Sequence, residues 1–161
     1  MDILFEQKVT QNAALAAETI WQAVVEAYTA SGRRTGISIP LAMLILPLTF
    51  HQRTARALAG KTKPAALYKA LADDREITVG LQGRMQALAP RTYAALAIGF
   101  RSGLIRLDAS ADWQLIPGRK SSPFDHGDDD VKTIISAAKR VGQAFAEMSP
   151  AQISTQLKVH F

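Results

Sequence analysis

The sequence predicts a mainly α-helical protein, a single domain over residues 1–161 that contains a winged helix-turn-helix with one small β-hairpin as its wing. Three observations lead to this fold class. Apolar residues recur at helical spacing in long stretches near both ends of the chain. In the middle, two short runs of β-branched, aromatic and other apolar residues flank a polar turn. Hydrophobic residues make up 48% of the 161 residues, which is enough to supply a buried core.

The N-terminal part, residues 12–72, is predicted to be helical. Its first helix is expected from about Asn12 to Ser31, where apolar side chains recur every three or four residues and Asn12 is suited to cap the N-terminus. Gly32 is expected to end this helix. Its polar residues are assigned to the solvent-facing side, and these are Glu18, Gln22 and Glu26.

A strongly apolar segment follows the first helix. The stretch Leu41–Leu46 has no polar residue on any face, so burial on all sides is predicted. Pro40 is expected to open a helix at its first turn, whereas Pro47 is expected to stop or kink it. After a loop, Pro64 is expected to open a short helix that reaches about Ala72.

The winged-helix-like part is predicted over residues 77–117. A first helix near 79–88 is expected to end before Pro90, and a second helix to follow over Arg91–Gly103. The apolar spacing of this second helix predicts a buried stripe that contains Tyr93, Leu96 and Phe100.

A β-hairpin is predicted next, with strands over Leu104–Leu107 and Trp113–Ile116. Helix, tight turn, helix and hairpin in this order form the winged-helix arrangement, whose second helix can enter a DNA major groove. The C-terminal helices are predicted within residues 128–158. A long helix is expected from about Asp129 to Met148, and a short one from Pro150 to near Leu157.

No motif in the sequence indicates catalysis, a cofactor or a metal. The chain has no cysteine, no P-loop, no G-x-G-x-x-G and no H-E-x-x-H. His126 beside Asp125 and Asp128–Asp130 is the cluster that resembles a metal site, but acidic residues in the first turn of a helix also stabilise its positive end. The second interpretation is preferred, so we assign no catalytic, cofactor or metal residues and expect no enzyme.

The sequence also bears on location. Its first residues lack the basic segment and apolar run of a signal peptide. The longest uncharged stretch, Ile37–Phe50, is shorter than the roughly 18–20 residues of a membrane span. A cytoplasmic protein is therefore expected.

The net charge of +5 is concentrated in the middle of the chain. Residues 61–121 hold ten Lys and Arg against five Asp and Glu, a difference of +5. Such an excess is typical of a surface for nucleic acid or an acidic partner, and equally of an ordinary solvated surface. The candidate contacts with the DNA backbone are Arg84, Arg101, Arg106, Arg119 and Lys120. Any DNA binding is expected to be weak, indifferent to sequence and sensitive to salt.

The predicted second helix is poorly suited to reading bases, since the face opposite its buried stripe carries one arginine, an isoleucine and small residues. We therefore predict a protein-contact surface, formed by Arg91, Ala95, Ile98 and Ser102. Replacing Ile98 with Asp is then expected to leave the fold intact and to abolish partner binding. The alternative is that Ile98 packs under the wing or the long C-terminal helix as core.

Three stretches carry a family resemblance. The first is Gly36–His51, an apolar run that ends in Leu-Pro-Leu-Thr-Phe-His and is followed by Thr54 to Arg56. The second is Arg84–Gly103, with Leu-Ala-Pro-Arg-Thr and Gly-Phe-Arg-Ser-Gly-Leu. The third is Ala137-Ala-Lys-Arg-Val-Gly-Gln-Ala-Phe-Ala, followed by a short helix closing in Leu157-Lys-Val-His. In this order they resemble the middle-component family of three-component ABC systems. The chain departs from the family where Asn12 is followed by Ala instead of Pro, and where the C-terminus lacks the usual glycine and arginine.

The resemblance implies a set of partners. It implies a bacterial operon that encodes a coiled-coil ABC ATPase of the SMC/Rad50-like type, this middle component and a third protein with a variable effector end. It also implies a role in anti-phage or anti-plasmid defence, with the middle component as an adaptor that couples the ATPase to the effector. A free-standing winged-helix DNA-binding transcriptional regulator is the alternative, and an enzyme that uses Asp125–Asp130 is the least favoured interpretation.

Overall fold

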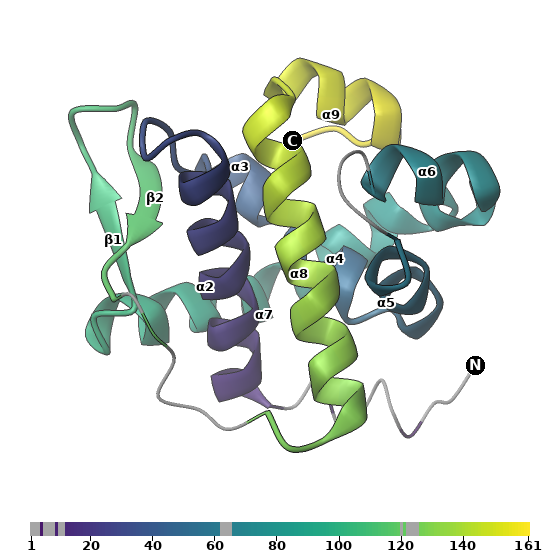
Figure 1. The fold of residues 1–161 in the computed structure, drawn as a ribbon, viewed down its shortest axis with the longest axis horizontal. Coiled ribbons are helices and arrows are strands. Elements are labelled where there is room, and N and C mark those ends of the chain that lie inside the picture. Colours follow the sequence, from purple (N-terminus) through teal and green to yellow (C-terminus); the bar gives the residue numbers. More distant parts are fainter. Residues whose placement is uncertain (1–3, 5–8, 10–11, 62–65, 120, 122–125) are drawn as a thin grey trace.

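Two long helices from opposite ends of the chain, α2 (Ala13–Ala30) and α8 (Asp129–Glu147), lie side by side at the centre of the molecule (Figure 1). We describe the chain from a computed structural model, which places residues 4, 9, 12–61, 66–119, 121 and 126–161. The two helices approach closely because Gly142 of α8 faces the backbone of α2: a Cβ atom there would lie 2.2 Å from the carbonyl oxygen of Ala23. Small residues at the crossing thus fix the centre of the fold.

Helix α2 begins as predicted, with the Asn12 side chain accepting a hydrogen bond from the amide of Leu15 at 2.9 Å. The polar face assigned to it is wrong, because Glu18 is only 1% exposed and Gln22 is also buried. The helix packs against α8, against the long helix α7 (Leu81–Arg101) and against the hairpin. Since α2 is covered on several sides, its polar side chains have partners inside the protein instead of water.

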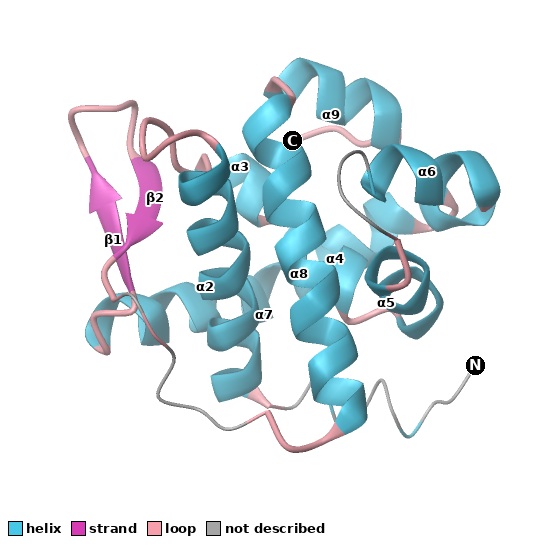
Figure 2. Cartoon of the chain, viewed as in Figure 1, coloured by secondary structure: helices cyan, strands magenta, loops and turns pink. Residues whose placement is uncertain are grey.

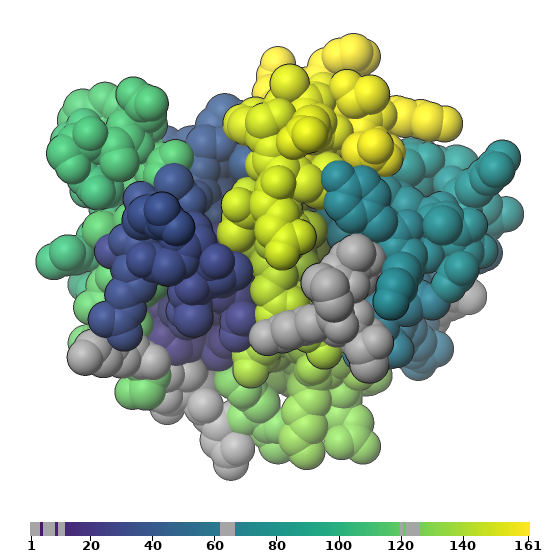
Figure 3. All heavy atoms as spheres, turned by 45° about the horizontal axis from the view of Figure 1, so that its top comes forward, coloured from purple at the N-terminus to yellow at the C-terminus, as the bar shows by residue number. Residues whose placement is uncertain are grey.

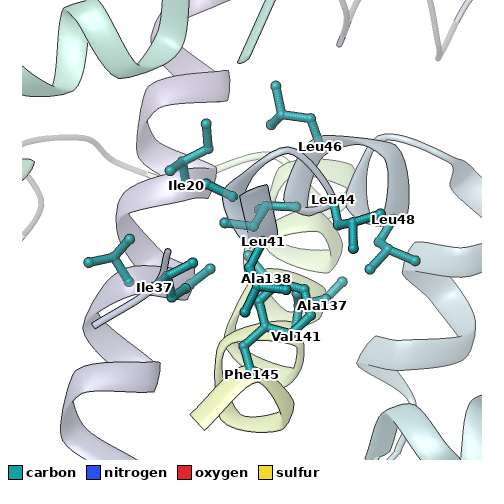
Figure 4. Close-up of a cluster of buried hydrophobic side chains, with 14 of the residues drawn as sticks. Ile20, Ile37, Leu41, Leu44, Leu46, Leu48, Ala137, Ala138, Val141 and Phe145 are labelled. Carbon is teal, nitrogen blue, oxygen red and sulfur yellow. The ribbon is translucent and has the colours of Figure 1, made fainter. Parts of the chain in front are cut away.

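The apolar segment after α2 forms the core, as predicted. Two short helices, α3 (Ile39–Ala42) and α4 (Ile45–Thr49), bring it against α2 and α8 (Figure 4). Pro40 opens α3, but Pro47 does not stop a helix. It occupies the first turn of α4, where the backbone N–H groups have no partner within the helix and the missing N–H costs nothing.

Three shorter elements pack together at one end of the molecule, at the right of Figure 1. They are helix α5 (Gln52–Ala59), helix α6 (Ala66–Asp73) and the 3-10 turn η1 (Arg75–Thr78). Arg53 links α5 to η1, since its guanidinium donates to Asp74, which caps η1, at 2.6 Å and to Glu76 at 2.5 Å. Pro64, expected to open α6, lies outside the described residues.

The helix-turn-helix predicted around Pro90 is absent. Helix α7 runs without a break from Leu81 to Arg101 and contains Pro90 in its interior. Pro90 and the residue one turn before it, Gln86, are both exposed, so the carbonyl that loses its hydrogen bond to the proline faces water. The interruption is therefore tolerated, and the two predicted helices are one.

The predicted hairpin is confirmed. Strands β1 (Ile105–Asp108) and β2 (Gln114–Pro117) pair antiparallel and are the magenta arrows of Figure 2. The bridge between Ile37 and Leu115 ties the other edge of β2 to the segment after α2. Outside these residues, the regular structure of the described chain is helical, which confirms the mainly α fold class.

The C-terminal helices also follow the prediction. Asp128 caps α8 by accepting from the amide of Asp130 at 2.8 Å, and Ser149 forms a capping box with Gln152 at the start of α9 (Pro150–Leu157). The apolar stripe of α8 is buried, with Val131 packed at its edge. None of the helices described is long and apolar enough to cross a membrane.

Candidate functional site: an uncharged groove on helix α7

The surface predicted on α7 for protein contact faces the protein instead. Ala95 is 0% exposed, and Ile98 packs against the core. A Cβ atom on Gly99 would lie 2.9 Å from the side chain of Ile105 in β1. The predicted set is therefore divided, with Ala95 and Ile98 inside, Arg91 half-buried and Ser102 exposed.

The error lies in the rotational setting of the helix. Hydrophobicity assigned the aromatic residues to the core, yet Tyr93 is 60% and Phe100 41% exposed. Helix α7 instead turns Thr92, Ala95 and Gly99 inwards, because small side chains let it approach its neighbours closely. The spacing of these small residues was the signal in the sequence that indicates a packed face.

The outward face of α7 borders a groove with a volume of about 400 Å³. The groove lies between α3, α7 and the last residues of the chain, which reach α7 through a pair of hydrogen bonds. The amide of His160 donates to the Gln82 side chain at 2.9 Å, and that side chain donates to the His160 carbonyl at 3.2 Å. The lining residues are Ile39, Pro40, Met43, Gln82, Met85, Gln86, Ala89, Tyr93, His160 and Phe161.

The lining of this groove has no Lys, Arg, Asp or Glu side chain. Ile39 is 37%, Tyr93 60% and Phe161 52% exposed, so apolar and aromatic surface is open to solvent. Two flexible thioethers, Met43 and Met85, lie along the lining. Such a surface offers shape and apolar area instead of charge, and it is the kind of groove that receives the apolar face of a helix.

The basic residues predicted to contact DNA do not form one surface. Arg84 is engaged inside the fold, where its guanidinium donates to the carbonyls of Ile77 at 3.1 Å and Val79 at 3.0 Å. Arg101, Arg106 and Arg119 are exposed around the end of α7 and the hairpin.

Two of these arginines, Arg106 and Arg119, lie beside glycines at the base of the hairpin. A Cβ atom on Gly118 would lie 3.2 Å from Arg106, and one on Gly103 would lie 3.9 Å from Arg119. Lys120, the last of the predicted contacts, lies outside the described residues.

The His126 cluster forms no metal site in the described part of the chain. His126 Nε2 lies 3.1 Å from Oε1 of the buried Glu18, which also accepts from Gln22 at 3.1 Å. Asp128 caps α8, as the preferred interpretation expected. Asp125 lies outside the described residues.

Comparison with known proteins gives one family. The model of the family described as "ABC-three component (ABC-3C) system Middle Component 3" matches residues 2–161, essentially the whole chain. Neither the curated proteins nor the solved structures give a match.

Proposed function

The chain belongs to the middle component 3 family of ABC-three component systems, and we propose that it acts there as a non-enzymatic adaptor. In this proposal it couples an ABC ATPase of the SMC/Rad50 type to a third, effector component of an anti-phage or anti-plasmid system. Membership of the family implies partner components in general. The observation that carries the adaptor role is the uncharged groove beside α7.

The groove favours one kind of partner segment. Because its lining presents apolar and aromatic side chains with amide and imidazole groups, a charged segment would lose water there without gaining an ion pair to a Lys, Arg, Asp or Glu side chain. An amphipathic helix of a partner component, with its apolar face turned into the groove, would bury Tyr93 and Phe161 instead. Exposed aromatic side chains of this kind are common centres of binding energy in protein interfaces.

The regulator alternative receives less support from the fold. The turn between two helices that it requires falls inside the continuous helix α7. The exposed residues in the second half of this helix are Tyr93, Ala94, Phe100 and Arg101, of which only Arg101 is a common base-reading side chain. We propose that contact with DNA, where it occurs, is made to phosphates by the exposed Arg101, Arg106 and Arg119.

Co-purification of the three components tests the adaptor proposal. We expect Tyr93→Asp in the full chain to abolish capture of the partner that uses the groove, because the interface would lose a central aromatic ring and bury a charge. Truncation of such a residue costs about 2 kcal/mol or more, which is roughly a thirtyfold loss of affinity.

Phe100→Asp is the matched control, since Phe100 is an exposed aromatic residue on the same helix that does not line the groove. It is expected to retain both partners, and both variants are expected to melt like the parent chain. If the folded Tyr93→Asp protein still captures both partners, the groove is not the docking site and the adaptor proposal loses its support.

A further inference from the structure

A second hollow, with a volume of about 410 Å³, lies between the end of α2 and the end of β2. Figure 3 shows the C-terminal turns of α2, in dark blue, beside the hairpin, in green. Each side of the hollow contributes an exposed arginine, Arg33 after α2 and Arg119 after β2. The remaining lining residues are Val25, Tyr28, Thr29, Pro117 and Gly118.

The loop that carries Arg33 is held in place by its own hydrogen bonds. Arg33 has a left-handed backbone, φ 62°, which is uncommon for a residue with a side chain. Its amide donates to the carbonyl of Tyr28 at 2.7 Å. The Ser31 hydroxyl closes the same loop by accepting from the amide of Thr35 at 3.1 Å and donating to the carbonyl of Tyr28 at 2.9 Å. The backbone of Arg33 is therefore fixed beside Tyr28.

The backbone of Arg119 is anchored from the core. Its carbonyl accepts from the indole N–H of the buried Trp21 at 3.3 Å, a contact between residues 98 apart in sequence. The preceding amide, of Gly118, donates to the carbonyl of Leu104 at 2.7 Å. A Cβ atom on Gly118 would lie 2.2 Å from the carbonyl oxygen of Gly103, so this approach requires glycine. The backbones of Arg33 and Arg119 are thus both held by hydrogen bonds, although the two residues come from distant parts of the chain.

The charge of the hollow is uncompensated by the described part of the chain. The hollow has no acidic lining residue, and neither Arg33 nor Arg119 forms an ion pair with a described carboxylate. Arg53 differs from both, because its charge is neutralised by ion pairs with Asp74 and Glu76. Guanidinium groups without a protein partner are suited to bind a phosphate group through charge-assisted hydrogen bonds.

The lining also suits the rest of a nucleotide. Tyr28 supplies an aromatic ring, and Val25 and Pro117 supply apolar surface, at the same hollow as the arginines. Bases stack on aromatic side chains with little regard to sequence, while a basic groove holds the backbone. The volume of about 410 Å³ falls within the range of roughly 300–1,000 Å³ that is usual for small-ligand sites.

We propose that this hollow binds one nucleotide unit, with its phosphate between Arg33 and Arg119 and its base against Tyr28. The proposal rests on the phosphate contact proposed above for Arg119 and narrows it to a defined site. It does not depend on the groove beside α7. The nucleotide is either free or one unit of a single strand, because the bases of a duplex are already stacked on each other and cannot reach Tyr28.

The test measures binding of the full chain to three probes by fluorescence anisotropy: labelled oligothymidylate, a labelled duplex, and a labelled free nucleotide. If the hollow binds one unit of a single strand, the oligothymidylate is expected to bind more tightly than the duplex. If it binds a free nucleotide, the free nucleotide is expected to bind at least as tightly as the oligothymidylate. Arg33→Gln and Arg119→Gln are each expected to weaken this binding by about tenfold, the usual effect of losing a charge-assisted hydrogen bond. Tyr28→Leu is expected to weaken nucleotide binding while leaving binding of labelled tripolyphosphate unchanged.

Arg75→Gln is the matched control, since it removes the same charge from an exposed residue that neither lines the hollow nor belongs to the phosphate contacts proposed above. If Arg75→Gln weakens binding as much as Arg33→Gln, the binding is a diffuse effect of positive charge, and the hollow fails while the groove beside α7 is unaffected. If no probe binds, or if only the duplex binds, the proposal that the hollow binds a nucleotide, free or in a single strand, is wrong. Thermal melts of each variant separate loss of the site from loss of the fold.

Discussion

The groove beside α7 and the hollow beside β2 have nearly the same volume, about 400 and 410 Å³, but opposite chemistry. The groove has an uncharged lining with exposed aromatic side chains, whereas the hollow has two arginines and no carboxylate. Apolar area selects protein segments with an apolar face, and unpaired guanidinium groups select phosphate. In the two proposals above, the groove and the hollow therefore bind different kinds of ligand, a partner helix and a nucleotide.

The two regions also differ in how the fold builds them. The groove is a by-product of the way α7 packs, because small residues turned inwards leave Tyr93 and Met85 beside α3. The hollow depends instead on two loop ends, whose backbones are fixed by hydrogen bonds to Tyr28, Trp21 and Leu104. The groove is therefore expected to survive changes in the loops, and the hollow to survive changes on α7.

The largest effect is expected for Ile98→Asp, which tests the inward face of α7. Because Ile98 packs against the core, a carboxylate there loses apolar contacts and is partly buried without a partner. We expect a loss of about 3 kcal/mol in the free energy of unfolding, enough to unfold much of a marginal domain. This reverses the expectation from sequence that the variant stays folded.

Denaturant unfolding of Ile98→Asp beside Tyr93→Asp checks this prediction. Both changes place a carboxylate on α7, so the difference between their free energies of unfolding compares the inward and outward faces of one helix. An Ile98→Asp protein as stable as Tyr93→Asp would show that the setting of α7 described above is wrong, and the groove would lose its structural basis.

An intermediate effect is expected from salt, which separates the two regions without any substitution. One phosphate held between Arg33 and Arg119 predicts that the logarithm of the binding constant for a single strand falls with the logarithm of salt concentration with a slope of about −0.7. Binding of a partner helix in the uncharged groove is expected to change little over the same range. A steep salt dependence of partner capture by the folded chain would mean that the partner uses the basic surface instead.

The sequence predicted α2, α8 and the hairpin because these depend on local signals. Asn12 and Asp128 cap their helices through their own side chains, and the paired runs around 108–112 form the hairpin. What it could not predict depends on neighbours. Glu18 is buried beside Gln22 of the same helix, and His126 supplies a partner from a distant part of the chain, which no periodicity indicates.

The candidate sites were harder to predict than the fold for the same reason. Arg33 lies far from Arg119 in sequence, and tertiary contacts bring their segments together, among them the hydrogen bond from Trp21 to Arg119 and the bridge between Ile37 and Leu115. The groove was missed because the apolar spacing placed Tyr93 in the buried stripe, whereas α7 turns small residues such as Ala95 and Gly99 inwards and leaves Tyr93 60% exposed. Packing of small residues overrode hydrophobicity there.

The smallest effect on nucleotide binding is expected at another basic hollow, which serves as a control for the hollow at Arg33 and Arg119. A hollow of about 570 Å³ beside α5 is lined by three arginines, Arg53, Arg56 and Arg84. Of these, Arg53 is already neutralised, because it is paired with Asp74 and Glu76. The hydrogen bond from Arg53 lowers the pKa of Asp74 below its usual value of 3.8, and the Asp74 carboxylate in turn raises the pKa of Arg53. This hollow is therefore expected to bind nucleotide much less well than the one at Arg33 and Arg119.

The depressed pKa of Asp74 gives this last prediction a pH dependence with a definite sign. The native carboxylate binds its proton less readily than the carboxylate of the unfolded chain, so the pair stabilises the fold above pH 3.8 and the stabilisation is lost as pH falls through the lower native pKa. Asp74→Asn is expected to lower the melting temperature slightly near neutral pH, and the difference from the parent chain is expected to shrink below pH 3.8. The same variant removes one of the two acidic partners of Arg53, so a gain of nucleotide binding at neutral pH would show that this pairing weakens phosphate binding at the hollow. A melting difference that grows as pH falls would contradict the assigned pair.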